Sequence, residues 1–240
     1  MKKSSQAAMV IAHRTCPLHE AENSLAGIKR AGVLGVDGVE IDVRITRDGI
    51  PVLVHDRTLW RYCRLPLPPR WLSFDRLRRI KRRDNGLQIP TLDEALSALP
   101  DGVVMAIEVK DPRAAVPAIA EIRRHGVEGR VLLWAKSAQA VRVFARELPH
   151  TERALLRDTW SARANRRFLE DATDCDADAV SAHWNRITPG FVADAHAMGL
   201  RVYSMTRDAG DPASRLATGL DGVITDWPEL ALATVRDGLA

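Results

Sequence analysis

The chain has 240 residues, of which 46% are hydrophobic and 28% are charged, proportions that are ordinary for a soluble globular protein. No apolar stretch is long enough to cross a membrane, and the start of the chain looks like a short polar tail rather than a leader sequence. The formal net charge is +4, but the arginines are dispersed, which does not favour a nucleic-acid-binding protein. The three cysteines form no CxxC pair, which argues against structural zinc and disulfides and favours a cytoplasmic location.

Short apolar runs alternate with helical patterns along the whole chain. In chain order we expect strands at Met9–Ala12, Gly38–Val43, Val52–Val54, Val103–Glu108, Val131–Trp134, Arg153–Leu156, Ala179–Ser181, Leu200–Ser204 and Gly222–Ile224. We expect helices at Ser24–Val33, Leu92–Leu99, Ala114–His125, Ala138–Glu147, Ala162–Ala172, Pro189–Met198, Asp211–Thr218 and Pro228–Val235. A strand followed by a helix about eight times over predicts an α/β fold, a single (β/α)8 TIM barrel that occupies residues 1–240 as one domain.

A short insertion follows the second strand of the predicted barrel. Residues 57–90 contain a cluster of prolines and aromatic residues and a basic run, Arg76–Arg83, that looks like a helix with a solvated face. Long loops at the carboxyl ends of barrel strands usually shape the substrate pocket, so we expect this role for residues 57–90. A Rossmann-type sheet is the alternative fold, but no G-x-G-x-x-G follows the first strand.

Charged residues gather where the predicted strands end. His13 and Arg14 close the first strand, and His55 closes the short third one. Alternate residues of a strand face the same side, so Glu40 shares a direction with Asp42, and Glu108 shares one with Lys110. If the strands are parallel, these seven side chains converge on one rim of the barrel, where barrel active sites lie.

Three of these residues, Glu40, Asp42 and Glu108, are candidate metal ligands. Carboxylates without thiolates favour Mg²⁺ or Ca²⁺ over zinc. The alternative is that Glu40 and Asp42 only form ion pairs with Arg44 and Lys110. We favour the metal site, because charged groups are rarely placed inside apolar strands without a ligand or partner.

The histidines are candidates for proton transfer. His13 and His55 each end a strand beside the carboxylates, which suits a general acid and a general base. Arg14 can hold two phosphate oxygens in a bidentate fork, and Lys110 can neutralise developing charge. Asn23 and Ser24 are explained as the start of a helix, whereas Glu22 is a supporting candidate that orients Arg14 or contacts substrate.

The ordered set of these residues resembles the glycerophosphodiester phosphodiesterase family. That family opens with H-R-G and continues with P-E-N-T, E-x-D, H-D, an I-E-[IVL]-K strand and a closing D-G-[IV]-[IV]-T-D-x-P. The corresponding segments here are His13-Arg14-Thr15, Ala21–Ser24, Glu40–Asp42, His55-Asp56, Ile107–Lys110 and Asp221–Pro228.

The resemblance implies a TIM barrel that uses a divalent cation, Mg²⁺ or Ca²⁺, to hydrolyse a small-molecule phosphodiester to glycerol 3-phosphate and an alcohol. By matching position, His13 and His55 are the acid–base pair, Glu40, Asp42 and Glu108 hold the metal, and Arg14 with Lys110 binds the phosphate. This sequence departs from the family pattern at Thr15, which replaces a glycine, and at Ala21, which replaces a proline. It also has Ser204–Asp208 where the family has W-T-[VI]-N, which removes an aromatic wall of the pocket.

Three rival functions stay open. A lysophospholipase D-like hydrolase, in peripheral contact with a membrane, would use the insertion residues Trp60, Tyr62, Leu65, Leu67 and Trp71 for an acyl chain or a bilayer surface. A non-catalytic barrel that binds anionic ligands would not need two histidines for proton transfer. Nucleic-acid binding through Arg76–Arg83 would need aromatic residues within that run, and it has none. The sequence carries no signal for the oligomeric state.

Overall fold

A closed barrel of parallel strands forms the centre of the protein. The structure is a computed structural model that describes residues 8–83, 86–157, 162–182, 187–206 and 216–236. Within these ranges β1 hydrogen-bonds to both β2 and β9, which closes a sheet of eight parallel strands. The eight strands are β1 (Met9–Ala12), β2 (Gly38–Ile45), β4 (Val104–Val109), β5 (Val131–Ala135), β6 (Arg153–Arg157), β7 (Ala179–Ala182), β8 (Arg201–Thr206) and β9 (Gly222–Thr225). The predicted (β/α)8 barrel is confirmed.

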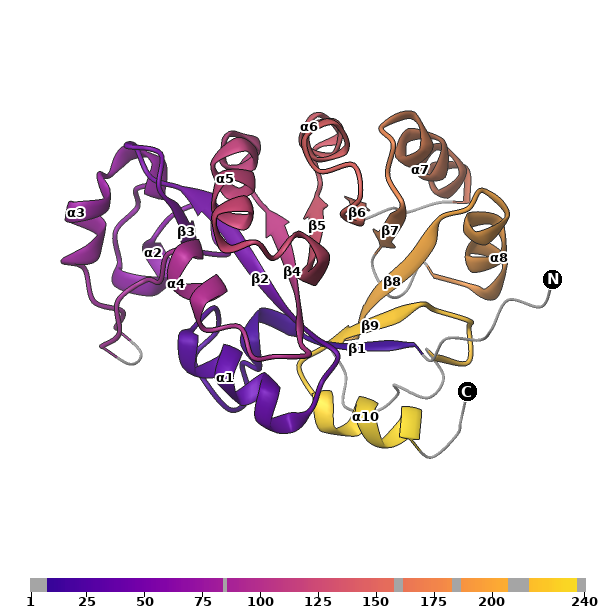
Figure 1. Ribbon diagram of the computed structural model, residues 1–240, viewed down its shortest axis with the longest axis horizontal. Coiled ribbons are helices and arrows are strands. Elements are labelled where there is room, and N and C mark those ends of the chain that lie inside the picture. Colours follow the sequence, from indigo (N-terminus) through magenta and orange to yellow (C-terminus); the bar gives the residue numbers. More distant parts are fainter. Residues whose placement is uncertain (1–7, 84–85, 158–161, 183–186, 207–215, 237–240) are drawn as a thin grey trace.

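Helices surround the barrel (Figure 1). α5 (Ala115–His125), α6 (Ala138–Glu147), α7 (Ala162–Asp174) and α8 (Pro189–Ala197) form an arc along the upper side of the view, and α1 (Leu25–Leu34) and α10 (Pro228–Arg236) lie on the opposite side of the strands. The short α4 (Leu92–Ser97) lies between α1 and α5 in the view. Side-chain caps start several helices, among them Ser24 at α1 and the capping box of Thr91 and Glu94 at α4. The helix expected over 211–218 falls largely outside the described residues.

Alternation along the strands divides the core into two layers. Outward-facing residues such as Val39, Ile41 and Val43 pack against the helices in the larger cluster. Inward-facing residues, including Ile11, Trp134 and Tyr203, fill the barrel interior. Polar residues that replace apolar ones at inward positions near the strand ends therefore come to the mouth of the barrel.

The insertion after β2 has a small core of its own. It contains β3 (Pro51–Leu53), which runs antiparallel to β2, then α2 (Trp60–Cys63), the 3₁₀ turn η2 (Pro69–Trp71) and α3 (Phe74–Arg78). Buried residues of this segment form a separate cluster of Val52, Val54, Leu59, Tyr62, Leu72, Leu77 and Ile89. In Figure 1 the insertion lies at the left edge of the molecule.

The basic helix predicted at Arg76–Arg83 is wrong in its extent. α3 ends at Arg78, and Arg82 lies beyond it with a side chain that is buried rather than solvated. The Arg82 guanidinium stacks on Tyr62 and donates to the carbonyl oxygen of Glu22 at 2.8 Å. These inward contacts explain why the chain leaves the helix before Arg82.

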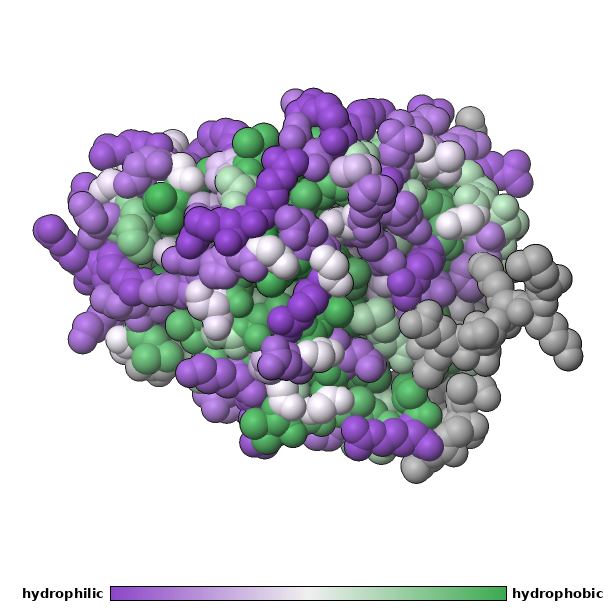
Figure 2. All heavy atoms as spheres, viewed as in Figure 1, coloured by the Kyte–Doolittle hydropathy of each residue, from purple (hydrophilic) through white to green (hydrophobic). Residues whose placement is uncertain are grey.

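The surface is dominated by polar side chains. On the face seen in Figure 2, hydrophilic residues cover most of the molecule and hydrophobic ones show in small separate groups. Within the described ranges, no helix combines the length and the apolar content that crossing a membrane requires.

Candidate functional site

The carboxyl ends of β1, β2 and β4 bring the predicted site residues together. Asp42 on β2 lies in register with Glu108 on β4, and Glu40 lies in register with Ala106, so the carboxylates come from neighbouring strands. The 3₁₀ turn η1 (His13–Thr15) follows β1 directly and packs against β2. His55 lies two residues after β3, and the carbonyl oxygen of His55 accepts hydrogen bonds from the Arg44 guanidinium.

Three buried carboxylates form the centre of the site. Oxygen atoms of Glu40, Asp42 and Glu108 lie within 4.8 Å of one another, and these residues are 3%, 1% and 8% exposed. Burial raises the pKa of Glu40 well above its usual range, and the charges of Asp42 and Glu108 add to this effect. The buried Glu108 Oε1 has no hydrogen-bond partner among the described residues. A hard divalent cation would satisfy this oxygen and relieve the repulsion, so the residues fit such an ion.

Lys110 is the cation closest to the carboxylates. Lys110 Nζ lies 3.0 Å from Asp42 Oδ1 and 2.7 Å from Glu108 Oε2. Burial alone would raise the pKa of Asp42, but Lys110, with His55 and Arg14, lowers it instead. The ion pair considered above as an alternative to metal binding therefore exists between Lys110 and Asp42. Arg44 is directed to the His55 carbonyl group and forms no ion pair with Glu40.

Arg14 borders the same cluster on the β1 side. The Arg14 backbone amide donates to Glu40 Oε2 at 2.8 Å, while Arg14 Nη1 lies 3.2 Å from Glu22 Oε2. The Arg14 Nε atom lies 3.5 Å from Asp42 Oδ2, and no described residue gives it a hydrogen bond although it is buried. An anionic ligand at the mouth of the barrel would supply the missing acceptor.

The backbone at η1 is strained. Arg14, Thr15 and Cys16 have φ angles of 42°, 66° and 62°, in the left-handed region that a β-branched residue rarely adopts. The family glycine expected at Thr15 would adopt this conformation without strain. Thr15 Oγ1 instead accepts a hydrogen bond from the Ser24 amide at 3.1 Å, which ties η1 to the start of α1.

Asn23 is a site residue that the sequence analysis assigned only to a helix start. Its side chain donates to Asp42 Oδ2 at 2.8 Å and accepts from the Asp42 amide at 2.9 Å. Asn23 is fully buried with a φ of 53°, whereas the N-cap of α1 is Ser24. The double contact fixes the Asp42 carboxylate in one orientation. The position of Asn23 in the P-E-N-T-like segment was the available signal.

Each candidate histidine is paired with a carboxylate. His13 Nδ1 lies 2.6 Å from Asp226 Oδ1, and His55 Nδ1 lies 2.8 Å from Asp56 Oδ1. A carboxylate at Nδ1 fixes the ring so that Nε2 is the atom left for proton transfer. In the sequence Asp226 belongs to the closing motif, and the structure shows its contact with His13.

The two pairs differ in their surroundings. Arg61 donates to both oxygens of Asp56, at 2.8 and 3.1 Å, and this hydrogen bonding lowers the pKa of Asp56 to about 2. Burial lowers the pKa of His55 by more than the charge of Asp42 and the bond to Asp56 raise it. The neutral imidazole is therefore the favoured form of His55 in the metal-free protein at neutral pH.

Glu22 links the site to the insertion. Its carboxylate accepts from Arg14, from Arg61 Nη2 at 2.6 Å and from the Tyr62 hydroxyl at 2.6 Å. Burial would raise the pKa of Glu22, but the hydrogen bonds from Arg61 and Tyr62 lower it. The expected orienting contact between Glu22 and Arg14 is present.

An indole occupies the inner wall next to the carboxylates. Trp134 on β5 lies in register with Glu108 and packs against Tyr203, with ring centroids 5.3 Å apart. The buried Trp134 Nε1 has no hydrogen-bond partner within the described ranges. Met205 on β8, at the position of the family tryptophan, is only partly buried.

The surroundings of Cys16 disfavour a reactive thiolate. It is fully buried, and burial raises the pKa of its thiol to about 12, so the reactive thiolate is absent at neutral pH.

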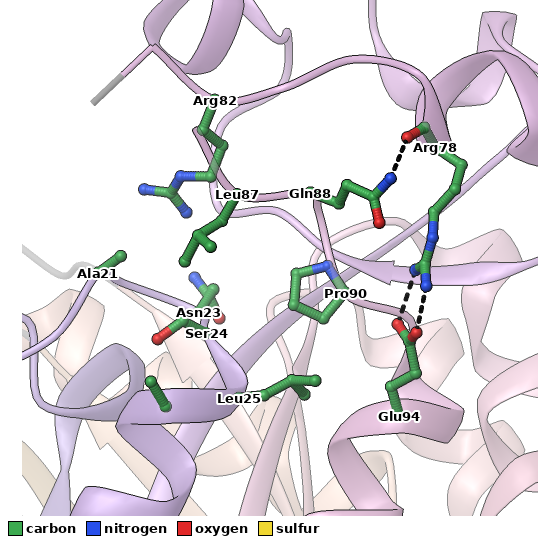
Figure 3. Close-up of a pocket in the computed structure, with 11 residues that line it drawn as sticks. Ala21, Asn23, Ser24, Leu25, Arg78, Arg82, Leu87, Gln88, Pro90 and Glu94 are labelled. Carbon is green, nitrogen blue, oxygen red and sulfur yellow. Dashed lines mark hydrogen bonds and ion pairs between the residues drawn. The ribbon is translucent and has the colours of Figure 1, made fainter. Parts of the chain in front are cut away.

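The cavity drawn in Figure 3 meets the candidate site only at Asn23. It measures about 290 Å³ and is bounded by the start of α1, by residues 87–90 and by the α3–α4 region. Arg78 donates to both oxygens of Glu94 at its rim, at 2.9 and 2.6 Å. Neither histidine and none of the three clustered carboxylates lines this cavity.

A second acidic group lies on the outer helices. Asp93 of α4 and Glu121 and His125 of α5 also offer three ligand atoms within 4.8 Å of one another. Arg124 contacts both of these carboxylates, and His125 Nε2 lies 2.8 Å from Asp93 Oδ1. The group is thus a partly exposed ion-pair network on the outer helices.

Known proteins resemble this chain over nearly its whole length. The chain is 29% identical over 246 residues to a glycerophosphodiester phosphodiesterase of Caldanaerobacter subterraneus subsp. tengcongensis, covering 96% of this chain and 98% of that protein. Its fold matches an Oleispira antarctica phosphodiesterase crystallised with the product sn-glycerol-3-phosphate, with a TM-score of 0.83, 23% identity and coverage of 96% and 97%.

A glycerophosphodiester phosphodiesterase from Parabacteroides distasonis gives a TM-score of 0.83 at 22% identity, covering 98% of this chain and 99% of that one. The model of the glycerophosphoryl diester phosphodiesterase family matches residues 13–230, from the first candidate histidine to the start of α10. The chain therefore belongs to the glycerophosphoryl diester phosphodiesterase family.

Proposed function

We propose that the rim around Glu40, Asp42 and Glu108 hydrolyses glycerophosphodiesters to glycerol 3-phosphate and an alcohol, with a divalent cation, Mg²⁺ or Ca²⁺, held by these three carboxylates. The observation that carries the proposal is the pair of carboxylate-bound histidines beside a buried carboxylate cluster that has an unsatisfied oxygen. When bound, the cation neutralises negative charge on the phosphate and on its ligands. Family membership supports this reaction class.

The side chains of this protein supply binding and proton transfer. Arg14, through its Nε, which has no hydrogen-bond partner among the described residues, and Lys110 bind the phosphate oxygens and balance the charge that develops on them. One histidine removes a proton from the nucleophile as the nucleophile oxygen bonds to phosphorus, and the phosphorus–oxygen bond to the alcohol breaks. The other histidine gives a proton to the leaving oxygen, so protons balance over the turnover. The nucleophile is water or a neighbouring hydroxyl of the substrate, and detection of a cyclic phosphate would identify the latter.

The insertion at residues 57–90 completes the proposed pocket. Arg61 and Tyr62 contact Glu22, which in turn contacts Arg14, so the insertion is connected to the phosphate-binding side of the site. We assign this segment to the same domain as the barrel and expect it to set the preference for the alcohol group. A cytoplasmic location stays a prediction.

The direct test is release of glycerol 3-phosphate from glycerophosphocholine and glycerophosphoethanolamine in the presence of Mg²⁺, Ca²⁺ or EDTA. We expect metal-dependent release that falls by about 10²- to 10⁴-fold in His13→Ala and in His55→Ala, with the fold intact by circular dichroism. Near-wild-type turnover in either variant contradicts the assignment of that histidine.

A matched control is available outside the site. His196 forms the same kind of pair with Asp221, at 2.8 Å, where the chain enters β9. His196→Ala should leave turnover unchanged, which separates loss of a site histidine from loss of any histidine–carboxylate pair.

Wild-type protein that binds the cation but releases no glycerol 3-phosphate would favour a hydrolase of lysophospholipids. Protein that binds no cation would favour a non-catalytic barrel that binds anionic ligands.

A further inference from the structure

The insertion presents two exposed tryptophans beside the candidate site. Trp60, at the start of α2, is 51% exposed, and Trp71, at the end of η2, is 58% exposed. The other aromatic and leucine residues once considered with them, Tyr62, Leu65 and Leu67, pack into the insertion core instead. Exposed apolar side chains that gather on one segment mark interaction surfaces, whereas the core residues need no further explanation.

Arginines accompany both tryptophans. The Arg64 guanidinium lies 5.3 Å from the ring centroid of Trp60, and that of Arg70 lies 5.8 Å from the centroid of Trp71. Neither arginine forms an ion pair with a described residue. Below, Trp60, Arg64, Arg70 and Trp71 are called the tryptophan–arginine surface.

The segment that carries both tryptophans is basic. Residues 57–71 contain four arginines and no aspartate or glutamate. A surface that combines indole rings with unpaired guanidinium groups is complementary to a layer of anionic headgroups over an apolar interior.

The same surface borders the mouth of the barrel. Trp60 is followed by Arg61, which holds Asp56 and through it His55. Trp71 is followed by Leu72, whose carbonyl oxygen accepts from the Arg47 amide at 2.8 Å, just beyond the carboxyl end of β2. The backbone hydrogen bond from Leu59 to Leu67, at 3.0 Å, keeps the two tryptophan-bearing turns together.

We propose that the tryptophan–arginine surface docks the protein onto an anionic lipid bilayer, with the indoles in the interface and the arginines at the headgroups. Docking in this orientation brings the barrel mouth to phosphodiesters at the membrane surface. That consequence rests on the proposed function, whereas docking itself does not.

The experiment is flotation of the full chain with vesicles of phosphatidylcholine alone or of phosphatidylcholine mixed with phosphatidylglycerol. We expect flotation with the mixed vesicles, weakened by salt. Trp60→Ala/Trp71→Ala should reduce partitioning at least about tenfold. Arg64→Gln/Arg70→Gln should reduce it on the anionic vesicles by roughly fivefold per arginine, with little effect on the neutral ones.

Matched variants control for lost apolar area and lost charge. Val33→Ala/Val116→Ala removes two side chains that are 76% and 59% exposed on α1 and α5, and Arg76→Gln/Arg79→Gln removes two exposed charges in and after α3. Both controls should float like the wild type, and all variants should unfold at similar temperatures.

Two outcomes overturn the proposal. The first is equal flotation with neutral and anionic vesicles, or no flotation with either kind. The second is binding that depends on the arginines but not on the tryptophans and is competed by heparin, which points to a soluble polyanion. His13→Ala should float like the wild type. If turnover fails while flotation persists, only the proposed hydrolysis is lost.

Discussion

His13 and Asp226 are 213 residues apart in the chain, yet His13 Nδ1 lies 2.6 Å from Asp226 Oδ1. The pairing of β1 with β9 closes the barrel and places the residue after β1 beside the residue after β9. The last strand of the fold thus supplies the partner that orients a histidine of the first.

Replacement of Asp226 tests this positioning role. Asp226→Asn keeps the shape of the side chain but removes the carboxylate that holds His13 in one tautomer. We expect turnover to fall by about 10²-fold or more, with substrate KM nearly unchanged, and the pH profile of turnover to shift.

A double-mutant cycle separates this role from a general structural one. If Asp226 acts through His13, the variant His13→Ala/Asp226→Asn should be no less active than His13→Ala alone. Independent, multiplicative losses would show that Asp226 acts in another way.

Much of the site could be predicted from sequence because of one property of parallel barrels. All strands end at the same rim, so charged residues at strand ends must meet there even when their separation in the chain is large. Glu40, Asp42, Glu108 and Lys110 were found in this way. Asp226 follows an apolar strand in the same way, but its role is recognised only once its contact with His13 Nδ1 is known.

The other features that the sequence did not predict depend on side-chain contacts. Asn23 has the residue type and position of a helix start. Only the structure shows that its side chain hydrogen-bonds to both the carboxylate and the backbone amide of Asp42. Arg82 belongs to a run of basic residues that resembles a solvated helix face, and tertiary packing on Tyr62 overrides that pattern. Local patterns do not encode contacts of this kind.

Gly27 allows η1 to approach α1. An ideal Cβ at Gly27 would lie 1.9 Å from the Thr15 carbonyl oxygen and 2.5 Å from Thr15 Oγ1. In most helices a glycine-to-alanine change stabilises by up to about 1 kcal/mol. Here we expect Gly27→Ala to destabilise the fold by more than about 2 kcal/mol in urea unfolding, because the backbone oxygen cannot move away without displacing η1.

The control for this change is Gly129→Ala, where nothing lies within 4 Å of the added Cβ. It should leave stability within about 0.5 kcal/mol of the wild type. Thr15→Gly should not rescue Gly27→Ala, because the closest atom belongs to the backbone. A Gly27→Ala protein as stable as the wild type would contradict the close approach.

The ion pair of Arg78 and Glu94 should make stability depend on pH. Hydrogen bonds from Arg78 lower the pKa of Glu94 by more than burial raises it. A carboxyl whose pKa is lower in the folded state stabilises the fold above its unfolded pKa of about 4.3, and this contribution is lost as pH falls through the folded-state pKa. Because the pair is partly exposed, we expect Glu94→Gln to cost less than about 1 kcal/mol at neutral pH.

Thermal unfolding across the acidic range checks the sign. The Tm of Glu94→Gln should lie below that of the wild type at neutral pH, and the gap should close once the wild-type carboxyl is protonated. Arg78→Gln should show the same convergence, and the double variant should be no worse than either single change at neutral pH. A gap that is constant or grows at low pH would assign the effect to the capping box of α4 instead.

Metal binding should be visible in stability without any turnover. A ligand that binds only the folded state at about 100-fold above its Kd stabilises by about 2.7 kcal/mol, which corresponds to roughly 5–10 °C in Tm for a chain of this size. If Glu40, Asp42 and Glu108 hold the ion, we therefore expect the Tm in Mg²⁺ or Ca²⁺ to exceed the Tm in EDTA by roughly this difference.

Glu40→Gln tests this assignment through two quantities, the Tm in EDTA and the rise in Tm on adding the cation. Its carboxylate is buried beside two others, which raises its pKa, so the neutral amide should leave the Tm in EDTA equal to or above that of the wild type. The amide oxygen can still accept from the Arg14 amide. The rise in Tm on adding the cation should be mostly lost, because one anionic ligand is gone.

Glu121→Gln, in the ion-pair network on the outer helices, is the matched control and should keep the full rise. The reverse pattern, with the rise lost in Glu121→Gln and retained in Glu40→Gln, would place the cation on the outer helices and remove Glu40 from the ligand set.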